Sequence, residues 1–279
     1  MTALVDPDGL AALLARGEPD VVLLDVQWEL GGRPGRELYA EAHLPEARFV
    51  DLDVDLADPP GIGGRHPLPG PSRLQDSLRR LGIHDSTTVV AYDQGSSLAA
   101  ARAWWLLGYV GLRDVRVLDG GLAAWQRSGR EVTTRVPGPA IPGTITVHPG
   151  ARPVLDAAGA ARVARSGLLL DARARERFEG RTEPIDAVAG HIPGAHNTPM
   201  ADYVGPDGRF LDPEHLHAYF AARGVFDRGE VGAYCGSGIT AAHLALALRR
   251  VGILAPVYVG SWSEWITDPA RPIATGPQD

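Results

Sequence analysis

The chain repeats itself, and this repeat constrains its fold more than any other feature. The apolar run Val21-Val-Leu-Leu-Asp25 ends in an aspartate, and Leu168-Leu-Leu-Asp171 does the same in the second half. The other matched blocks, in the same order in both halves, are Glu41–Ala47 with Ala189–Ala195, Thr88–Asp93 with Glu230–Cys235, and Val117–Trp125 with Tyr258–Trp265. Blocks that recur in the same order in both halves predict two copies of one structural unit.

Within each half, short apolar strands alternate with amphipathic helices. This alternation predicts an α/β fold in which a mostly parallel sheet is flanked by helices. Between the halves, Val136-Pro-Gly-Pro-Ala-Ile-Pro-Gly143 suits neither a helix nor a central strand. We therefore expect an N-terminal domain over 1–135, a linker over about 136–150, and a C-terminal domain over 151–279.

Cys235 is the only cysteine in 279 residues, and it stands between an apolar run and a glycine-rich turn. A strand should bring the thiol to the carboxyl edge of the sheet, and a helix is predicted over Ala241–Leu248. The glycines let backbone amides turn toward the sulfur, and a helix N-terminus adds partial positive charge there. Both effects favour the thiolate, which is the nucleophile. Asp93 stands at the matching place in the first half, so only the second half should be catalytic.

A buried, inert cysteine is the alternative interpretation, since free cysteines often behave as small hydrophobic residues. The Gly236-Ser-Gly238 context argues against it, because a core cysteine does not need small, flexible neighbours.

Composition excludes several classes of function. The net charge is −7 and the arginines are scattered, so there is no basic footprint for nucleic acid. No apolar stretch approaches the length of about 18 residues that would span a membrane, and no N-terminal signal segment is recognisable. A single cysteine rules out an internal disulfide and argues against a structural zinc site. We therefore expect a protein of the reducing cytoplasm without a metal or organic cofactor.

Four segments together make the chain similar to the tandem-domain rhodaneses, a family of sulfurtransferases. They are His43-Leu-Pro, Asp119–Trp125, Gly190-His-Ile-Pro-Gly-Ala195 and the Cys235 loop. In that family, thiosulfate sulfurtransferases typically carry Cys-Arg-Lys-Gly-Val-Thr, whereas 3-mercaptopyruvate sulfurtransferases carry Cys-Gly-Ser-Gly-Val-Thr. Cys235-Gly-Ser-Gly-Ile-Thr240 resembles the second form. Charge supports the division, because thiosulfate is a dianion that suits two loop cations, whereas mercaptopyruvate carries its charge on a carboxylate away from the sulfur.

The resemblance implies a substrate site around this loop. Arg173, Arg175 and Arg177 are candidates for binding the carboxylate with their planar guanidinium groups. The resemblance selects Arg177; a solvated surface arginine is the alternative. Ile185 and Asp186 stand where the family has its second arginine, and Arg181 could substitute. The remaining substrate-binding residues implied by the loop are Gly236, Gly238, Ile239 and Thr240.

A relay of Ser237, His66 and Asp53 is also implied by the resemblance. In such a relay the histidine orients and deprotonates the hydroxyl, and the aspartate fixes the histidine tautomer. It could serve the proton needs of the leaving enolate. Alternatively, Ser237 only shapes the turn and His66 only caps a loop.

Other polar and aromatic residues are expected to be structural. His43 and His191 occupy matching His-x-Pro turns, and only one of the two halves has a thiol. Asp25 and Asp171 should bond loop amides at strand ends. The tryptophan pairs of the two halves, Trp104 with Trp105 and Trp262 with Trp265, are expected in the core.

The implied activity is a two-step transfer from 3-mercaptopyruvate through a Cys235 persulfide. No second cysteine can resolve the persulfide, so a thioredoxin-like protein or a small thiol is the expected acceptor. A thiosulfate sulfurtransferase is the alternative, and a persulfide carrier without turnover is a further one. A cysteine-dependent phosphatase would need an arginine six residues after the nucleophile, where Ala241 stands.

Overall fold

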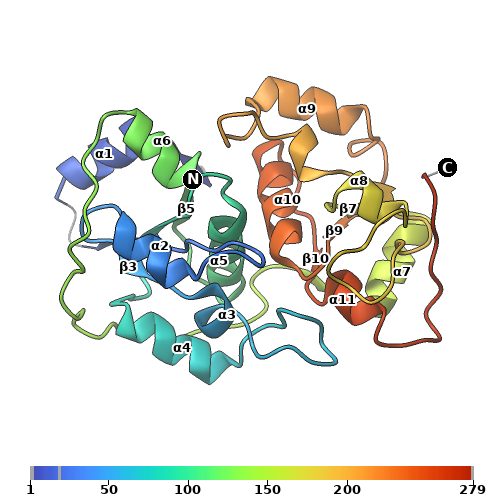
Figure 1. Cartoon of the computed structure of the whole chain (residues 1–279), viewed down its shortest axis with the longest axis horizontal. Coiled ribbons are helices and arrows are strands. Elements are labelled where there is room, and N and C mark those ends of the chain that lie inside the picture. The colour runs from blue at the N-terminus through green and yellow to red at the C-terminus, as the bar shows by residue number, and fades with distance from the viewer. Residues whose placement is uncertain (1–2, 18–19, 278–279) are drawn as a thin grey trace. The chain divides into compact units, whose positions relative to one another are not determined.

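The computed structural model describes residues 3–17 and 20–277, and it contains two five-stranded parallel sheets (Figure 1). The first sheet has the order β1-β5-β4-β2-β3, and its strands are β1 Leu4–Val5, β2 Val21–Asp25, β3 Arg48–Phe49, β4 Thr88–Tyr92 and β5 Val115–Leu118. The second has the order β6-β10-β9-β7-β8, and its strands are β6 Val154–Leu155, β7 Leu168–Asp171, β8 His196–Asn197, β9 Val231–Tyr234 and β10 Val257–Tyr258. The two orders are identical once the strands are matched, which confirms the predicted α/β fold and its repeat.

The register of the central strands agrees between the two sheets. Asp25 pairs with Tyr92 at the ends of β2 and β4, and Asp171 pairs with Tyr234 at the ends of β7 and β9. The residue after each central strand is Asp93 in one sheet and Cys235 in the other. Parallel strands present their carboxyl ends at one edge, so this edge of the second sheet holds the thiol.

Helices connect the strands in both repeats. Those of the first repeat are α1 Pro7–Ala15, α2 Gly35–Glu41, α3 Leu52–Asp55, α4 Pro71–Arg80, α5 Leu98–Tyr109 and α6 Gly121–Arg127. Those of the second are α7 Ala157–Ser166, α8 Arg175–Phe178, the 3₁₀ turn η1 Met200–Asp202, α9 Pro213–Ala221, α10 Ile239–Arg250 and α11 Ser261–Trp265. The helix that follows the thiol therefore starts at Ile239, two residues before the predicted Ala241.

An aspartate caps the first helix of each repeat in the same way. The Asp6 carboxylate accepts a hydrogen bond from Gly9 N at 2.7 Å, and the Asp156 carboxylate accepts one from Gly159 N at 2.7 Å. Such caps satisfy amides that have no partner within the helix. This shared strand–Asp–helix start is a further match between the halves, and the sequence comparison above did not use it.

Apolar side chains cover both faces of the second sheet. On one face, Val163 of α7 and the α11 residues Trp262 and Trp265 form a buried cluster with Leu169 and Tyr234. On the other, α10 packs against β9 and β10 (Figure 1). Its buried run is Ala241–Leu248. Trp104 and Trp105 are likewise buried in α5 of the first repeat. The prediction that all four tryptophans belong to the core is confirmed.

Packing divides the chain into two compact units. The first contains the chain up to Asp58, together with Pro69–Arg152 and the short Pro206–Arg209 segment. The second contains Pro59–Leu68, Pro153–Gly205 and the chain from Phe210 onward. The predicted linker over 136–150 thus falls within the first unit. The segment Pro59–Leu68 packs with the second, although it precedes that unit by about 90 residues.

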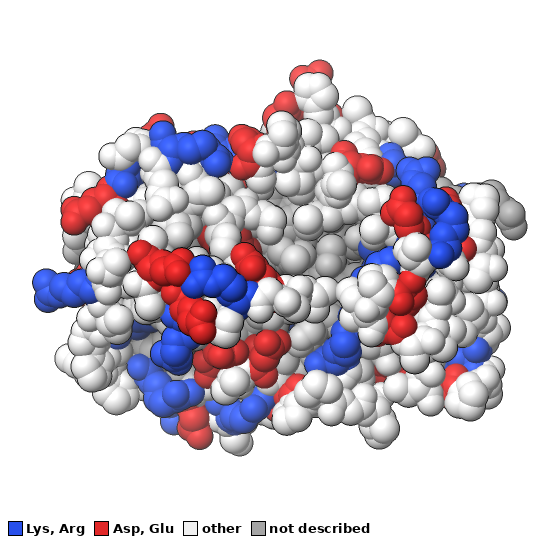
Figure 2. Space-filling model, in the orientation of Figure 1, with Lys and Arg blue, Asp and Glu red and all other residues white. Residues whose placement is uncertain are grey.

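Within the described residues, no helix is both long and apolar enough to cross a membrane. Acidic and basic side chains lie interspersed over the face shown in Figure 2. That pattern lacks the single-sign stripe by which nucleic-acid-binding surfaces are recognised.

Candidate active site

The thiol of Cys235 lies in a small nest of hydrogen-bond donors. It follows β9 directly, and only 1% of the residue is exposed. Gly238 N donates to Cys235 Sγ at 3.1 Å, and Ser237 N does so at 3.4 Å. Gly238 allows this turn because its φ of 82° lies in the left-handed region. The donors stabilise negative charge on the sulfur, as an anion-binding nest does.

Three further amides stand at the start of α10. The N–H groups of Ile239, Thr240 and Ala241 donate no hydrogen bond within the described part of the chain. The first turn of any helix leaves such donors unpaired, together with partial positive charge. They are available to a second sulfur atom or to a substrate oxygen at the mouth of the loop.

The Ser261 hydroxyl lies beside the same thiol. Its Oγ accepts a hydrogen bond from Cys235 N at 3.1 Å, donates to Tyr258 O at 2.8 Å and lies 4.0 Å from Cys235 Sγ. The residue has a φ of 54°, which is unusual for a residue with a side chain. Sequence reasoning treated the Tyr258–Trp265 block only as part of the repeat and missed this hydroxyl.

Ser237 and His66 are in contact within the second unit. His66 Nδ1 lies 2.8 Å from Ser237 Oγ, and both residues are at most 9% exposed. Asp53 belongs to α3 in the first unit, where Trp28 Nε1 donates to its Oδ2 at 3.1 Å. The structure therefore brings together the serine and the histidine of the expected relay.

Arg177 lies in α8 and pairs with two acidic side chains. Its Nε donates to Glu183 at 3.0 Å, and its Nη2 donates to Asp186 at 2.9 Å. Arg173, beside it, is buried and pairs with Asp171 at 2.7 Å. Asp171 also accepts a hydrogen bond from Arg173 N, as Asp25 does from Gln27 N, so the predicted loop-amide role of both aspartates is confirmed.

Arg65 is a second cation near the thiol loop, and sequence reasoning missed it. A side chain at position 236 would place its Cβ 2.7 Å from Arg65 Nη2 and 3.4 Å from Arg177 Nη2. Two guanidinium groups thus end beside the residue that follows the nucleophile. The adjacency of Arg65 to His66 in the glycine-rich segment Gly61–His66 was the available signal.

The other arginines considered from sequence have different surroundings. Arg181 is 57% exposed and pairs with Glu176 and Glu179 at 3.5 and 2.6 Å. Arg175 is exposed at the start of α8. Neither has a hydrogen bond or ion pair to the Cys235 loop among the described residues.

His43 and His191 have matching structural contacts. His43 Nδ1 is 2.7 Å from Tyr39 O, and His191 Nδ1 is 2.7 Å from Phe178 O. Each ring also stacks on that aromatic side chain, at 3.9 and 3.7 Å between centroids. These contacts agree with the turn role expected for both histidines. Within residues 3–17 and 20–277, moreover, no cluster of three or more histidine, cysteine or acidic side chains could hold a metal ion.

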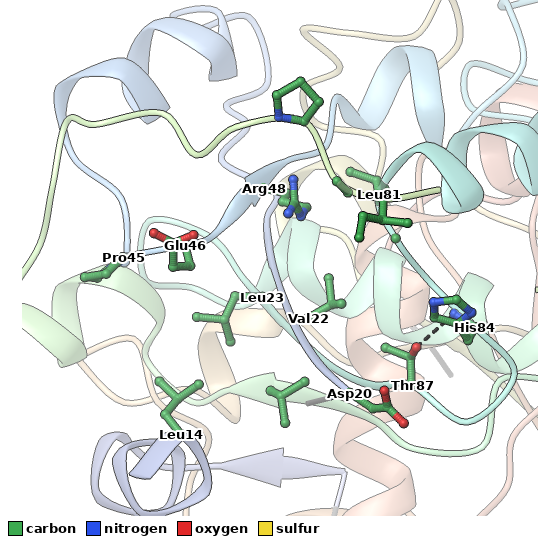
Figure 3. A pocket seen from close by; sticks show the side chains of 15 residues that line it. Leu14, Asp20, Val22, Leu23, Pro45, Glu46, Arg48, Leu81, His84 and Thr87 are labelled. Atoms are coloured by element: carbon green, nitrogen blue, oxygen red, sulfur yellow. Dashed lines mark hydrogen bonds between the residues drawn. The ribbon is translucent and has the colours of Figure 1, made fainter. Parts of the chain in front are cut away.

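A cavity of about 680 Å³ lies in the first unit, where strands β2, β3 and β4 begin (Figure 3). It is therefore at the amino edge of that sheet and not at the carboxyl edge. Val22 and Leu23 of β2 line it together with Leu14, and His84 and Thr87 are joined by a hydrogen bond at its margin. The residues that line it include neither a cysteine nor any member of the expected site. We therefore locate the chemistry at the Cys235 loop.

The fold and the thiol loop define a protein of two like α/β units, one of which holds a buried thiol in a nest of amide donors. Comparison with protein families agrees: the rhodanese-like domain matches residues 6–128 and again 154–268. The chain belongs to the rhodanese family, as its resemblance in sequence had indicated.

Its relatives are named as sulfurtransferases of both kinds. The chain is 48% identical to a probable 3-mercaptopyruvate sulfurtransferase of Pseudomonas aeruginosa, with 98% of each chain covered. It is 44% identical to the putative thiosulfate sulfurtransferase SseB of Mycobacterium tuberculosis, covering 98% of this chain and 97% of that one. Among solved structures, SseA of Escherichia coli, titled a 3-mercaptopyruvate sulfotransferase, matches with a TM-score of 0.82 at 30% identity, covering 95% of this chain and all of that one.

Proposed function

We propose that this protein transfers sulfur from 3-mercaptopyruvate to a thiol acceptor through a persulfide on Cys235. The observation that carries the proposal is the Cys235 nest, in which Gly238 N and Ser237 N donate to the sulfur, beside a serine in contact with His66. A nucleophilic thiolate needs such donors, and a leaving enolate needs a proton-transfer group. The names of the relatives support the same reaction class.

In the first step, the Cys235 thiolate attacks the sulfur of 3-mercaptopyruvate. A sulfur–sulfur bond forms, the carbon–sulfur bond breaks, and its electron pair goes to the substrate as an enolate. The proton of the substrate thiol ends on that carbon, which gives pyruvate and a deprotonated persulfide. In the second step, a thiol RSH takes the outer sulfur as RSSH, and the Cys235 thiolate returns.

Ser237, His66 and Asp53 are proposed to carry the proton in the first step. Ser237 Oγ donates to His66 Nδ1 in the required tautomer, and Asp53 would fix that tautomer through the other ring nitrogen. The amides of Gly236, Gly238, Ile239 and Thr240 are proposed to hold the persulfide and the substrate, with Arg177 on the carboxylate. Arg181, with its two glutamate partners, is the weaker candidate for a second cation.

The acceptor is proposed to be external to the chain. Cys235 is the only cysteine in the sequence, so the persulfide has no internal thiol to resolve it. A thioredoxin-like protein or a small thiol fits this requirement. A thiol that must stay reduced also fits a reducing compartment, and we propose the cytoplasm.

Thiosulfate is a second candidate donor because of the two arginines beside Gly236. They could supply the cations that the loop itself lacks. Steady-state turnover with 3-mercaptopyruvate and thiosulfate, with one thiol acceptor, tests the choice. A higher kcat/KM for mercaptopyruvate is expected, whereas a preference for thiosulfate would contradict the proposed donor.

Two variants test the mechanism independently of the donor. Cys235→Ser should abolish turnover and persulfide labelling, and retained activity would contradict the whole proposal. Ser237→Ala should lower kcat for mercaptopyruvate about 100-fold with little change in KM, because general acid–base groups contribute at least that much. An unchanged kcat would remove Ser237 from the relay.

A further inference from the structure

Arg65 reaches the thiol loop from a segment far away in the sequence. Ser263 Oγ accepts a hydrogen bond from Arg65 N at 3.0 Å, and Gly61 and Gly64 exchange two backbone hydrogen bonds of 3.0 Å. Gly64 has a φ of 97°, and a Cβ there would lie 2.7 Å from Gly260 O. This close approach fixes the backbone that carries Arg65 against the loop before α11.

Asp186 holds Arg65 and Arg177 together. One of its carboxylate oxygens pairs with Arg65 Nη1 and the other with Arg177 Nη2. The Asp186 side chain is only 4% exposed, and that of Arg65 is 23% exposed. The shared Asp186 carboxylate thereby orients both planar guanidinium groups. Their other N–H groups remain for other acceptors.

Several donors of these two arginines have no partner. Arg65 Nε is buried without a hydrogen bond, and Arg65 Nη2 and Arg177 Nη1 make none among the described residues. Arg65 Nη2 lies 2.7 Å, and Arg177 Nη1 3.7 Å, from where a Cβ at position 236 would stand. A buried donor without an acceptor is unfavourable, so the buried Arg65 Nε and the two outer N–H groups beside it favour an incoming acceptor.

The length of the donor brings its carboxylate close to the thiol loop. Burial lowers the pKa of the Arg65 guanidinium, and a thiolate at Cys235 would oppose that shift. The carboxylate of 3-mercaptopyruvate is separated from its sulfur by two carbon atoms. A donor whose sulfur meets Cys235 therefore brings its carboxylate to the neighbourhood of the next residue, Gly236.

We propose that Arg65 is the second guanidinium of the donor-binding site and binds, together with Arg177, the carboxylate of an α-keto thiol donor. The inference rests on the proposed function and adds a specificity residue to it. It also explains the glycine at position 236, since a side chain would occupy the space of the guanidinium groups. Arg65 takes the role for which the sequence offered Arg181.

The test compares Arg65→Ala with the wild-type protein on two donors, one with a carboxylate and one without. They are 3-mercaptopyruvate and mercaptoacetone, which has a methyl group in place of the carboxylate. We expect Arg65→Ala to raise the KM for mercaptopyruvate and the inhibition constant of pyruvate about 10- to 100-fold, as loss of a charge-assisted contact should. The kcat/KM for mercaptoacetone should change less than about threefold.

Two more variants make the comparison decisive. Arg162→Ala removes a half-exposed arginine that pairs with Glu230 and should leave all constants unchanged. Arg181→Ala tests the other candidate for the second cation, and it should raise the KM less than Arg65→Ala does. A KM effect in Arg181→Ala and none in Arg65→Ala would overturn the inference in favour of Arg181. Equal losses on mercaptopyruvate and mercaptoacetone would reduce Arg65 to a structural residue and overturn it as well.

Thiosulfate distinguishes a carboxylate site from a general anion site. A larger loss on thiosulfate than on mercaptopyruvate in Arg65→Ala would contradict the carboxylate assignment. If Arg65→Ala does not fold, Arg65→Lys keeps the charge without the planar fork and should still raise the KM. Wild-type protein that fails to use mercaptopyruvate would contradict the proposed function, whereas wild-type turnover with unchanged KM in the Arg65 variants contradicts only this inference.

Discussion

Ser261 and Gly121 occupy equivalent positions and have the same φ of 54°, although only one of them has a side chain. Their equivalence follows from the next residues: Trp262 N donates to Cys235 O at 3.0 Å, and Leu122 N donates to Asp93 O at 2.8 Å. The first half, which has no thiol, has Gly121 here, and glycine is the residue that a positive φ favours. The half with the thiol keeps a serine there, whose hydroxyl lies beside the sulfur.

The strain at Ser261 predicts an unusual order of stabilities. Ser261→Ala and Ser261→Gly both remove the hydroxyl that accepts from Cys235 N, but only the glycine variant also removes the left-handed strain. We expect Ser261→Gly to be more stable than Ser261→Ala by about 1–2 kcal/mol, the cost of that conformation with a Cβ. Urea unfolding measures the difference, and an alanine variant at least as stable would show that the backbone is not strained.

The same pair of variants should react more slowly with the donor. Because the Ser261 hydroxyl donates to Tyr258 O at 2.8 Å, the two amides at 3.1 and 3.4 Å are the main donors to the sulfur. Losing a full donor to developing negative charge costs about 10²–10³-fold in rate, so we expect persulfide formation to slow by less than about tenfold in both. Single-turnover labelling of Cys235 measures it.

Asp93 is the carboxylate counterpart, in the first repeat, of the Cys235 thiol. Its two oxygens accept from Gly95, Ser97, Ala99 and Ala100 amides at 2.9 to 3.2 Å, and the residue is 1% exposed. Asp93→Asn would turn an NH₂ group toward two of these amides. We expect it to destabilise the protein by about 2–4 kcal/mol, since buried donors would lose their acceptor.

Asp76→Asn is the matched control for Asp93→Asn. Asp76 is exposed in α4, and its substitution should change stability by less than about 0.5 kcal/mol. Chemical denaturation of both proteins gives the comparison. Equal stabilities would mean that the loop after β4 relaxes around the amide.

Local patterns in the sequence were enough to predict the sheets and the position of the Cys235 thiol after a strand. The apolar runs that end in Asp25 and Asp171 became matching central strands, because strands buried on both faces must be continuously apolar. Cys235 stands at the carboxyl edge because a strand, a tight turn and a helix follow one another in the sequence. These features depend on near neighbours along the chain.

Arg65 could not be placed in this way. It reaches the loop only because Gly64 packs against Gly260 and Arg65 N bonds Ser263, contacts between residues almost 200 positions apart. The resemblance to the family suggested Arg181 instead, which the structure pairs with two glutamates of its own segment. A sequence does not show which of several arginines is turned toward a site by distant backbone packing.

Gly236→Ala tests the crowding around the thiol loop. The new Cβ would meet Arg65 Nη2 at 2.7 Å, and this is the mobile end of a long side chain. We therefore expect a stability change below about 1 kcal/mol, together with a KM for mercaptopyruvate raised about tenfold because the guanidinium is displaced. In an Arg65→Ala background the same substitution should raise KM much less, since coupled sites are not additive.

Gly229→Ala is the control for this substitution, because a Cβ there would meet no atom within 4 Å. It should leave KM unchanged. Full additivity of Gly236→Ala and Arg65→Ala would show that the two residues act separately.

Asp25 and its counterpart Asp171 have hydrogen-bond partners that differ in charge. Gln27 donates to the Asp25 carboxylate from Nε2 at 2.9 Å, where Arg173 pairs with Asp171. Burial raises the pKa of the Asp25 carboxyl to about 6, against hydrogen bonds from Tyr92 and Gln27 that lower it. In the unfolded chain the carboxyl has its ordinary pKa of 3.8.

Between these two values, the folded protein binds more protons at Asp25 than the unfolded chain does. The contribution of Asp25 to the free energy of unfolding therefore falls as the pH rises from about 4 to 6, by at most about 3 kcal/mol for two pKa units. The residue is fully buried, so solvent does not screen the effect. Asp25→Asn should remove this part of the pH dependence, and Gln27→Arg should reduce it by supplying the cation that Asp171 has. Urea unfolding of the three proteins from pH 4 to 7, taken as differences so that other titrations cancel, measures it. A wild-type slope identical to that of Asp25→Asn would mean that Asp25 is already ionised at pH 4, with its hydrogen bonds outweighing its burial.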